Sequence, residues 1–176
     1  MKYIALSLFL LVFLITSAQS WSSYIDPDEL FEIEVPGEVE VREKRILTGI
    51  DTIDVYSYVI DRSIQGEANF LYLVNVADYP EGTFPADSVS LIDDFLQASV
   101  ESLVLNAGGK LDYSAEHGTL SDALKLRISQ EDKDTIIKAV VLISKDRFFT
   151  LQVFTRKLYS LNKEVDRFLD SFTLLH

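Results

Sequence analysis

The sequence predicts an α+β domain in which a largely antiparallel sheet packs against two main helices. Short runs of β-branched and aromatic residues recur along the chain with tight turns between them, which is typical of antiparallel strands. Only two segments carry apolar residues at helical spacing, at residues 87–105 and after Asn162. No repeat or linker interrupts the series, so we expect one domain.

A hairpin between residues 134 and 157 is expected to form the middle of the sheet. Residues 135–144 and 148–155 read as two long strands joined by a tight turn at 145–147. Nearly every position of the first strand is apolar, which indicates burial on both faces. A strand buried on both faces needs neighbours on either side, so other strands must pair with this hairpin.

The first 18 residues have the layout of a secretory signal peptide. Met1-Lys2 precede an apolar run from Ile4 to Ile15, and the small residues that follow predict cleavage after Ala18 or Ser20. The alternative is a retained membrane anchor. However, twelve residues form a helix of about 18 Å, which is short for a hydrocarbon core of about 30 Å. We therefore expect the single domain to span residues 24–176.

Four strands are expected before the first helix, and turn formers separate them. They lie at residues 31–35, 39–43, 54–60 and 70–76. The preceding segment, residues 21–29, is short and acidic, and reads as a turn or a capping segment. Residues 79–85 are rich in turn formers and aromatic residues, and these aromatics could line a cleft.

The helix at residues 87–105 is expected to begin at Asp87 or Ser88 and to end at Gly108-Gly109. Two shorter strands, at residues 111–115 and 123–129, then lead to the central hairpin. A closing helix is expected to follow Asn162, whose side chain is suited to capping it.

The composition excludes some partners and indicates a compartment. The chain has 28 Asp and Glu against 16 Lys and Arg, and no Cys. Because a surface this acidic repels phosphate groups, we expect no nucleic-acid binding and no membrane contact after signal cleavage. The alternative is that the negative charge serves solubility alone. The missing disulfides and N-glycosylation sequences favour a bacterial periplasmic or secreted protein.

Groups for catalysis are scarce in this sequence. The histidines are His117 and His176, and no nucleophile elbow, phosphate loop or zinc motif occurs. His117 beside Glu116 could act as a general base on Ser114 or Ser121, but a solvated loop histidine is the simpler interpretation. We therefore predict no catalysis, no cofactor and no metal site.

A carboxylate- or Ca²⁺-assisted hydrolase is the alternative from another functional class. Two acidic turns supply oxygen ligands, at residues 131–134 and 26–29, but neither has the spacing of a Ca²⁺-binding loop. Asp93 and Asp94 are adjacent on the expected helix and diverge by about 100°, so they cannot face one substrate together.

Aromatic side chains outside the expected core are the better functional candidates. They could form a patch or groove for a protein partner or a small apolar ligand, unless a second layer simply covers them. The candidate residues are Tyr56, Tyr58, Tyr79, Phe84, Phe148 and Phe154.

Three features together resemble the PsbP-like domains. They are an opening F-x-I-x-x-P at residues 31–36, the hairpin that leads into Phe148–Phe154, and a closing F-L-x-S-F-x-L at residues 168–174. The resemblance implies an α-β-α sandwich and a non-catalytic binding or accessory role, and it carries over no site residues. The expected function is therefore an exported, non-catalytic binding or accessory domain; the alternatives are the hydrolase and a carrier of a small apolar ligand.

Overall fold

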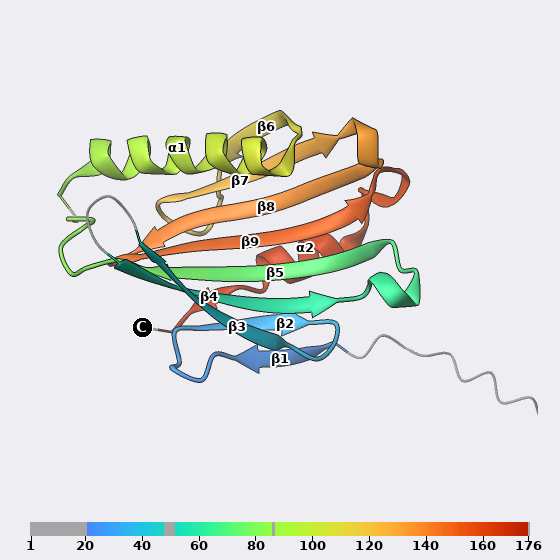
Figure 1. The fold of residues 1–176 in the computed structure, drawn as a ribbon, viewed down its shortest axis with the longest axis horizontal. Coiled ribbons are helices and arrows are strands. Elements are labelled where there is room, and N and C mark those ends of the chain that lie inside the picture. The colour runs from blue at the N-terminus through green and yellow to red at the C-terminus, as the bar shows by residue number, and fades with distance from the viewer. Residues whose placement is uncertain (1–20, 48–51, 86, 176) are drawn as a thin grey trace, which may run out of the picture.

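Seven antiparallel strands form the main sheet of this computed structural model, which describes residues 21–47, 52–85 and 87–175 (Figure 1). The order across the sheet is β3 (Glu40–Leu47), β4 (Thr52–Asp61), β5 (Asn69–Asp78), β9 (Arg147–Arg156), β8 (Thr135–Ser144), β7 (Ala123–Gln130) and β6 (Lys110–Glu116). The hairpin of β8 and β9 lies at the middle, as the sequence predicts. The predicted signal peptide lies outside the described residues.

The hairpin turn leaves only Lys145 and Asp146 unpaired, because Ser144 pairs with Arg147. Lys145 has a φ of 54°, in the left-handed region that such a tight turn requires. Every residue of β8 is buried except Lys138 and Ser144, which are half-buried, so both of its faces are covered. This confirms the two-sided burial expected from its apolar sequence.

A smaller sheet lies against one face of the main sheet. In it β2 (Phe31–Val35) pairs with β1 (Ser22–Ile25) on one side and with β10 (Thr173–Leu174) on the other. The sequence did not predict β1, which falls in the segment read as an acidic turn. Asp26 explains the hairpin, since its Oδ2 accepts the backbone N–H groups of Asp28 at 3.0 Å and Leu30 at 3.3 Å.

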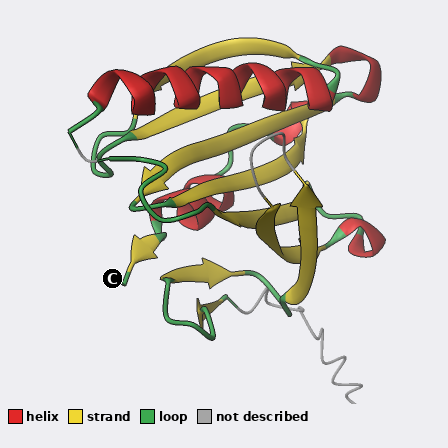
Figure 2. Cartoon of the chain, turned by 60° about the vertical axis from the view of Figure 1, so that its left-hand side comes forward, coloured by secondary structure: helices red, strands yellow, loops and turns green. Residues whose placement is uncertain are grey.

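Two helices of the described chain lie on opposite faces of the main sheet (Figure 2). One face carries α1 (Val89–Ala107); the other carries α2 (Lys163–Asp170) together with the small sheet. The Asn162 side chain caps α2 by accepting the N–H groups of Glu164 and Val165. Ser88 begins α1 without a side-chain cap, and Gly108 ends it at a φ of 60°. The arrangement is the expected α+β fold with helix, sheet and helix layers.

The described part of the chain contains three short 3-10 helices, all in loops. They are η1 (Ser63–Gln65), η2 (Glu131–Lys133) and η3 (Lys157–Tyr159), and all three follow strands of the main sheet at the same end of the molecule (Figure 1). No helix among the described residues is long and apolar enough to cross a membrane.

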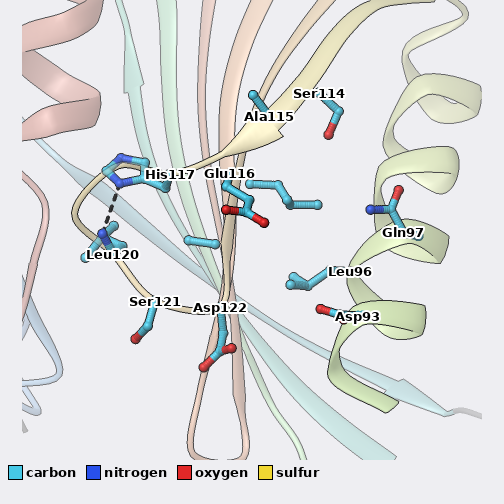
Figure 3. A pocket seen from close by; sticks show the side chains of 12 residues that line it. Asp93, Leu96, Gln97, Ser114, Ala115, Glu116, His117, Leu120, Ser121 and Asp122 are labelled. Carbon is cyan, nitrogen blue, oxygen red and sulfur yellow. Dashed lines mark hydrogen bonds between the residues drawn. The ribbon is translucent and has the colours of Figure 1, made fainter. Parts of the chain in front are cut away.

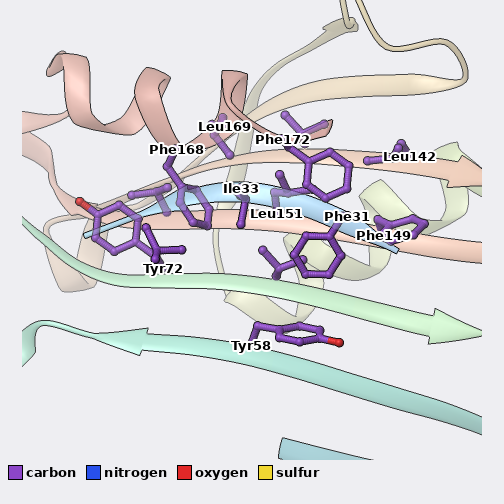
Figure 4. Packing of buried hydrophobic residues seen from close by; sticks show 14 of the residues in the cluster. Phe31, Ile33, Tyr58, Tyr72, Leu142, Phe149, Leu151, Phe168, Leu169 and Phe172 are labelled. Atoms are coloured by element: carbon purple, nitrogen blue, oxygen red, sulfur yellow. The ribbon is translucent and has the colours of Figure 1, made fainter. Parts of the chain in front are cut away.

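The largest core cluster lies between the main sheet and the layer of α2 and the small sheet (Figure 4). Phe31 of β2 is at its centre and is fully buried. Its ring centroid lies 5.1 Å from that of Tyr58, 5.4 Å from that of Phe172 and 6.5 Å from that of Phe149. One side chain thus joins the small sheet, the main sheet and the C-terminal segment.

We expect Phe31→Ala to lower the free energy of unfolding by about 3–5 kcal/mol, because it opens a cavity where the three segments meet. Urea denaturation followed by circular dichroism measures this change. The control is Leu47→Ala, at a side chain that is 82% exposed, which should change stability by less than about 0.5 kcal/mol. Equal effects of the two substitutions would contradict the central position of Phe31.

Candidate functional site

Four aromatic rings pack together between one end of α1 and the main sheet. Tyr79 and Phe84 come from the loop between β5 and α1, Phe95 from α1, and Phe148 from β9. Phe95 lies at the centre, with ring centroids 5.6 Å from Tyr79, 4.8 Å from Phe84 and 5.2 Å from Phe148. The rings meet edge to face, which is a favoured geometry for aromatic pairs. The structure therefore brings three of the six sequence-predicted residues together.

Asp146, in the turn between β8 and β9, fixes the loop that carries these aromatics. Its Oδ2 accepts the backbone N–H of Gly82 at 2.9 Å, and its Oδ1 accepts that of Phe84 at 3.0 Å. The Asp146 carbonyl accepts the N–H of Tyr79. The hydrogen bonds from Phe84 and Gly82 lower the pKa of the Asp146 carboxyl. The hairpin turn thus positions the irregular stretch that the sequence indicated as a cleft lining.

A groove runs along the flank of α1 that faces the β3 edge of the main sheet; we call it the α1 groove. It consists of two adjoining cavities of about 500 Å³ and 440 Å³, which share Leu103 and Asn106. Small side chains on this flank of α1, at Ala98, Ser99 and Ser102, leave the space open. The lining also includes Ile53, Val55, Ala77, Tyr79, Phe148, Gln152 and Phe154.

Polar side chains form a row across strands β4, β5 and β9, next to the α1 groove. On neighbouring strands the Ser57 hydroxyl donates to Asn75 Oδ1 at 2.7 Å, and Asn75 Nδ2 donates to Thr150 Oγ1 at 3.0 Å. The strand register puts these residues on the same face as Phe148 and Phe154. Sequence reasoning missed this polar row, although polar residues inside otherwise apolar strands were its signal.

Tyr56 and Tyr58 lie on the opposite face of the main sheet. Tyr58 is only 5% exposed, and its hydroxyl donates to the Asp26 carboxylate. Burial, followed by this hydrogen bond, raises the pKa of Tyr58. Tyr56 is half-buried beside the same core cluster. The six predicted residues therefore do not form one patch: Tyr79, Phe84 and Phe148 gather at one end of α1, Phe154 lines the groove further along, and the tyrosines of β4 belong to the other layer.

A polar pocket lies on the other flank of α1, between the helix and the turn from β6 to β7 (Figure 3). Its volume is about 710 Å³. Asp93 and Gln97 come from α1, Glu116 from β6, and Ser121 and Asp122 from the turn. Within the described residues, no three side chains of the metal-binding types are grouped closely enough to hold a metal ion.

His117 fastens the turn beside this pocket. Its Nδ1 accepts the backbone N–H groups of Thr119 at 3.3 Å and Leu120 at 3.1 Å. The ring points away from α1, whereas Ser114 and Ser121 lie elsewhere around the pocket (Figure 3). Burial, with a smaller contribution from Lys125, lowers the pKa of His117. Nδ1 also lies 3.3 Å from the Thr119 hydroxyl. Neither Ser114 nor Ser121 forms a hydrogen bond with the described His117 ring, so the serine–histidine pair considered from the sequence is not formed.

The acidic residues considered for a hydrolase are dispersed over the structure. Asp26 and Asp28 lie in the turn between β1 and β2, where Asp26 holds the backbone and Tyr58. Glu131 and Asp132 belong to η2, at the end of the main sheet. Asp93 lines the polar pocket, and its neighbour Asp94 does not. A carboxylate-based active site requires several carboxylates close together, and these candidate residues do not lie close together.

Comparison with known proteins supports the fold. No model of a known protein family matches the sequence, and no curated protein matches it significantly. Among solved structures, the chain is similar to the solution structure of cyanobacterial PsbP (CyanoP) from Synechocystis, with a TM-score of 0.53 and 15% sequence identity. The match covers 89% of this chain and 93% of that one.

The chain therefore has a PsbP-like fold, as the sequence resemblance implied. A match at 15% identity shows the fold alone, and different functions share one fold. The function must consequently be argued from the α1 groove and the polar pocket.

We expect Tyr58→Phe to lower the free energy of unfolding by about 1.5–3 kcal/mol, because the buried Asp26 carboxylate loses a hydrogen bond. Tyr56→Phe is the matched control and should change stability by less than about 0.5 kcal/mol. Urea denaturation of both variants measures the difference. A neutral Tyr58→Phe would contradict a stabilising role for its hydrogen bond to Asp26.

We expect the contribution of Asp146 to depend on pH. Because the folded state lowers the pKa of Asp146, its stabilising effect is present above the unfolded pKa of about 3.9 and disappears as the pH falls through the lower folded value. Asp146→Asn should lower the melting temperature at pH 7, and the difference from the unmodified chain should shrink below about pH 4. Thermal scans between pH 7 and pH 3 measure it, and a difference that grows on acidification would contradict the assignment.

Proposed function

We propose that the chain is an exported, non-catalytic binding or accessory domain that holds its partner in the α1 groove. The observation that carries the proposal is the incomplete cover of the main sheet. Ile92, Leu96 and Val100 pack α1 over β7 and β8. The half of the same face from β9 to β3 has no helix above it within the described part of the chain (Figure 2).

The lining of the α1 groove suits recognition. Apolar side chains at Ile53, Val55 and Phe148 supply apolar contact area, and the polar side chains of Ser102, Asn106 and Gln152 line the same groove and supply hydrogen-bonding groups. The groove is open to solvent along its length. Enclosed cavities are typical of carriers for small apolar ligands, so the open shape favours a protein partner over such a ligand.

The separation of the His117 ring from Ser114 and Ser121 (Figure 3) supports a role without catalysis. The PsbP-like fold supports it as well, because the family resemblance implies binding rather than chemistry. Export is supported by the predicted signal peptide and the Cys-free composition. A small apolar ligand remains the alternative occupant because much of the groove wall is apolar.

We expect bulky side chains in the α1 groove to abolish binding. Ala98 and Ser102 are both exposed and lie one helical turn apart on the groove side of α1. Ala98→Trp/Ser102→Trp should therefore fill the groove without disturbing the core. Native mass spectrometry of protein purified from its own cells should show a bound partner with the unmodified chain and none with this variant.

The matched control is Gln97→Trp/Glu101→Trp, which places the same two side chains on exposed positions outside the groove. It should retain the partner. Loss of binding in the control alone would indicate that the partner binds in the polar pocket. A rise in Nile red fluorescence that only the groove variant abolishes would instead assign the groove to a small apolar ligand. Turnover of ester, phosphate or glycoside substrates that is lost in His117→Ala would contradict the non-catalytic role.

A further inference from the structure

The outward side of α1 carries a second stripe of apolar and small side chains, besides the one that packs over β7 and β8. Leu91, Phe95, Ala98, Ser102 and Leu105 follow one another at alternating spacings of four and three residues. This is the heptad spacing of a helix that packs lengthwise against another helix. Leu91 is 45% exposed and Leu105 is 80% exposed. The stripe therefore lies open to solvent at both ends and is shaped to contact a helix.

The α1 groove beside this stripe has room for a helix. Phe95, Ala98 and Ser102 of the stripe also line the groove. The main sheet continues beneath it from β9 through β5 and β4 to β3. Neighbouring strands are about 4.8 Å apart, so these strands span roughly 15 Å, whereas a helix is about 10 Å wide. A helix lying in the groove would contact the sheet below and the stripe beside it.

The exposed flank of α1 that faces away from the groove is acidic. Asp94 and Glu101 are exposed there, and α1 contains no basic residue. Neither Asp94 nor Glu101 forms an ion pair with another described side chain. A surface in contact with this flank must therefore supply positive charge.

The far side of the α1 groove supplies that charge. Lys44 of β3 pairs with Val55 of β4, so its side chain lies on the face of the sheet that forms the groove. Arg42 and Glu40 share this face and form an ion pair with each other. Lys44 is exposed and forms no ion pair with another described side chain, so it gives this part of β3 an excess positive charge.

We propose that the α1 groove binds α1 of a second copy of this chain, in a dimer of two-fold symmetry. Naming this partner rests on the proposed function, which puts a partner in the groove. In the dimer the two α1 helices lie side by side and parallel between the two main sheets. Each helix covers β7 and β8 of its own sheet and the open half of the other sheet, and the two-fold axis runs parallel to the helices.

This symmetry brings the opposite charges together. A two-fold axis parallel to α1 leaves the position of each residue along the helix unchanged. The ring of Phe148 lies 5.2 Å from that of Phe95, and Phe148 belongs to the same row across the strands as Lys44. Lys44 of one copy is therefore level with Asp94 of the other. The acidic flank of each helix faces β3 of the other copy, so Lys44 and Asp94 meet across the interface.

The contact is large enough for a stable dimer. A helix of 19 residues is about 28 Å long and about 10 Å wide, so half of its surface is roughly 440 Å². Each copy contributes one helix and one groove and buries roughly 900 Å², which reaches the ~800 Å² per partner of specific interfaces. The net charge of −12 opposes association, but charges further apart than about 8 Å are largely screened at physiological salt. The contacts at the interface therefore decide.

The test is sedimentation velocity of the mature chain, as the expressing cell processes it, over a range of concentrations. The unmodified chain should sediment as a dimer. Lys44→Glu should raise the Kd of the dimer at least about tenfold, because a carboxylate then faces Asp94. Lys44→Glu/Asp94→Lys should restore the Kd to within about threefold, because the exchanged charges attract again. Within one copy the two residues lie on opposite sides of the groove, so this rescue requires a second copy.

Two leucine variants test the apolar stripe. Leu91→Ser/Leu105→Ser should raise the Kd at least about tenfold, because two apolar contacts are lost. The matched control is Leu158→Ser/Leu161→Ser, at leucines that are 81% and 89% exposed and lie outside the stripe. It should dimerise like the unmodified chain. An unmodified chain that is monomeric at every concentration overturns the proposal. Equal losses in the two leucine variants, or a charge exchange that restores nothing, also overturn it.

A failure of the dimer can be told apart from a failure of the groove as a binding site. A monomer that carries another protein in native mass spectrometry, and loses it in Ala98→Trp/Ser102→Trp, would exclude the second copy and keep the groove. A dimer that persists in Ala98→Trp/Ser102→Trp would place the contact elsewhere and overturn the dimer proposed here. The mass spectrum would then decide on the groove by itself.

Discussion

Burial of both faces of the β8–β9 hairpin is the constraint on which the rest of the structure depends. One face packs against α1 through residues such as Val141, and the other packs against α2 and the small sheet through residues such as Leu151. Neither helix alone could cover both faces. The order of the main sheet follows, because a hairpin buried in this way must have strands on each side.

The same constraint positions the candidate sites. Asp146 in the hairpin turn fixes the loop of Tyr79 and Phe84. Among the described residues, α1 packs over β7 and β8 and no helix lies over the strands from β9 to β3 on the same face. The α1 groove lies along that boundary. The core thus determines where the surface is free for binding.

Much of the fold could be predicted from the sequence, because strand and helix periodicity record burial directly. The apolar run of β8 and the alternation of β2 are examples, as is the Asn162 cap. The hairpin of β1 could not be predicted, because its exposed residues carry no apolar pattern and its turn depends on contacts of the Asp26 carboxylate with Tyr58, far away in the sequence. The site was predicted only in part for a similar reason. The alternation of residues along a strand shows which side chains share a face with Tyr58 or with Phe148. It does not show which of the two faces of the sheet a second layer covers.

Hydrogen exchange of individual backbone amides tests the central constraint most directly, since amides protected by two-sided burial exchange only through global unfolding. We expect the amides of residues 136–143 and 149–155 to exchange slowest, with one common free energy of opening. Amides of the edge strands β3 and β6, which are largely exposed, should exchange through local opening at lower free energies. Exchange in β8 and β9 as fast as in β3 would contradict the two-sided burial of the hairpin as the constraint that holds the fold together.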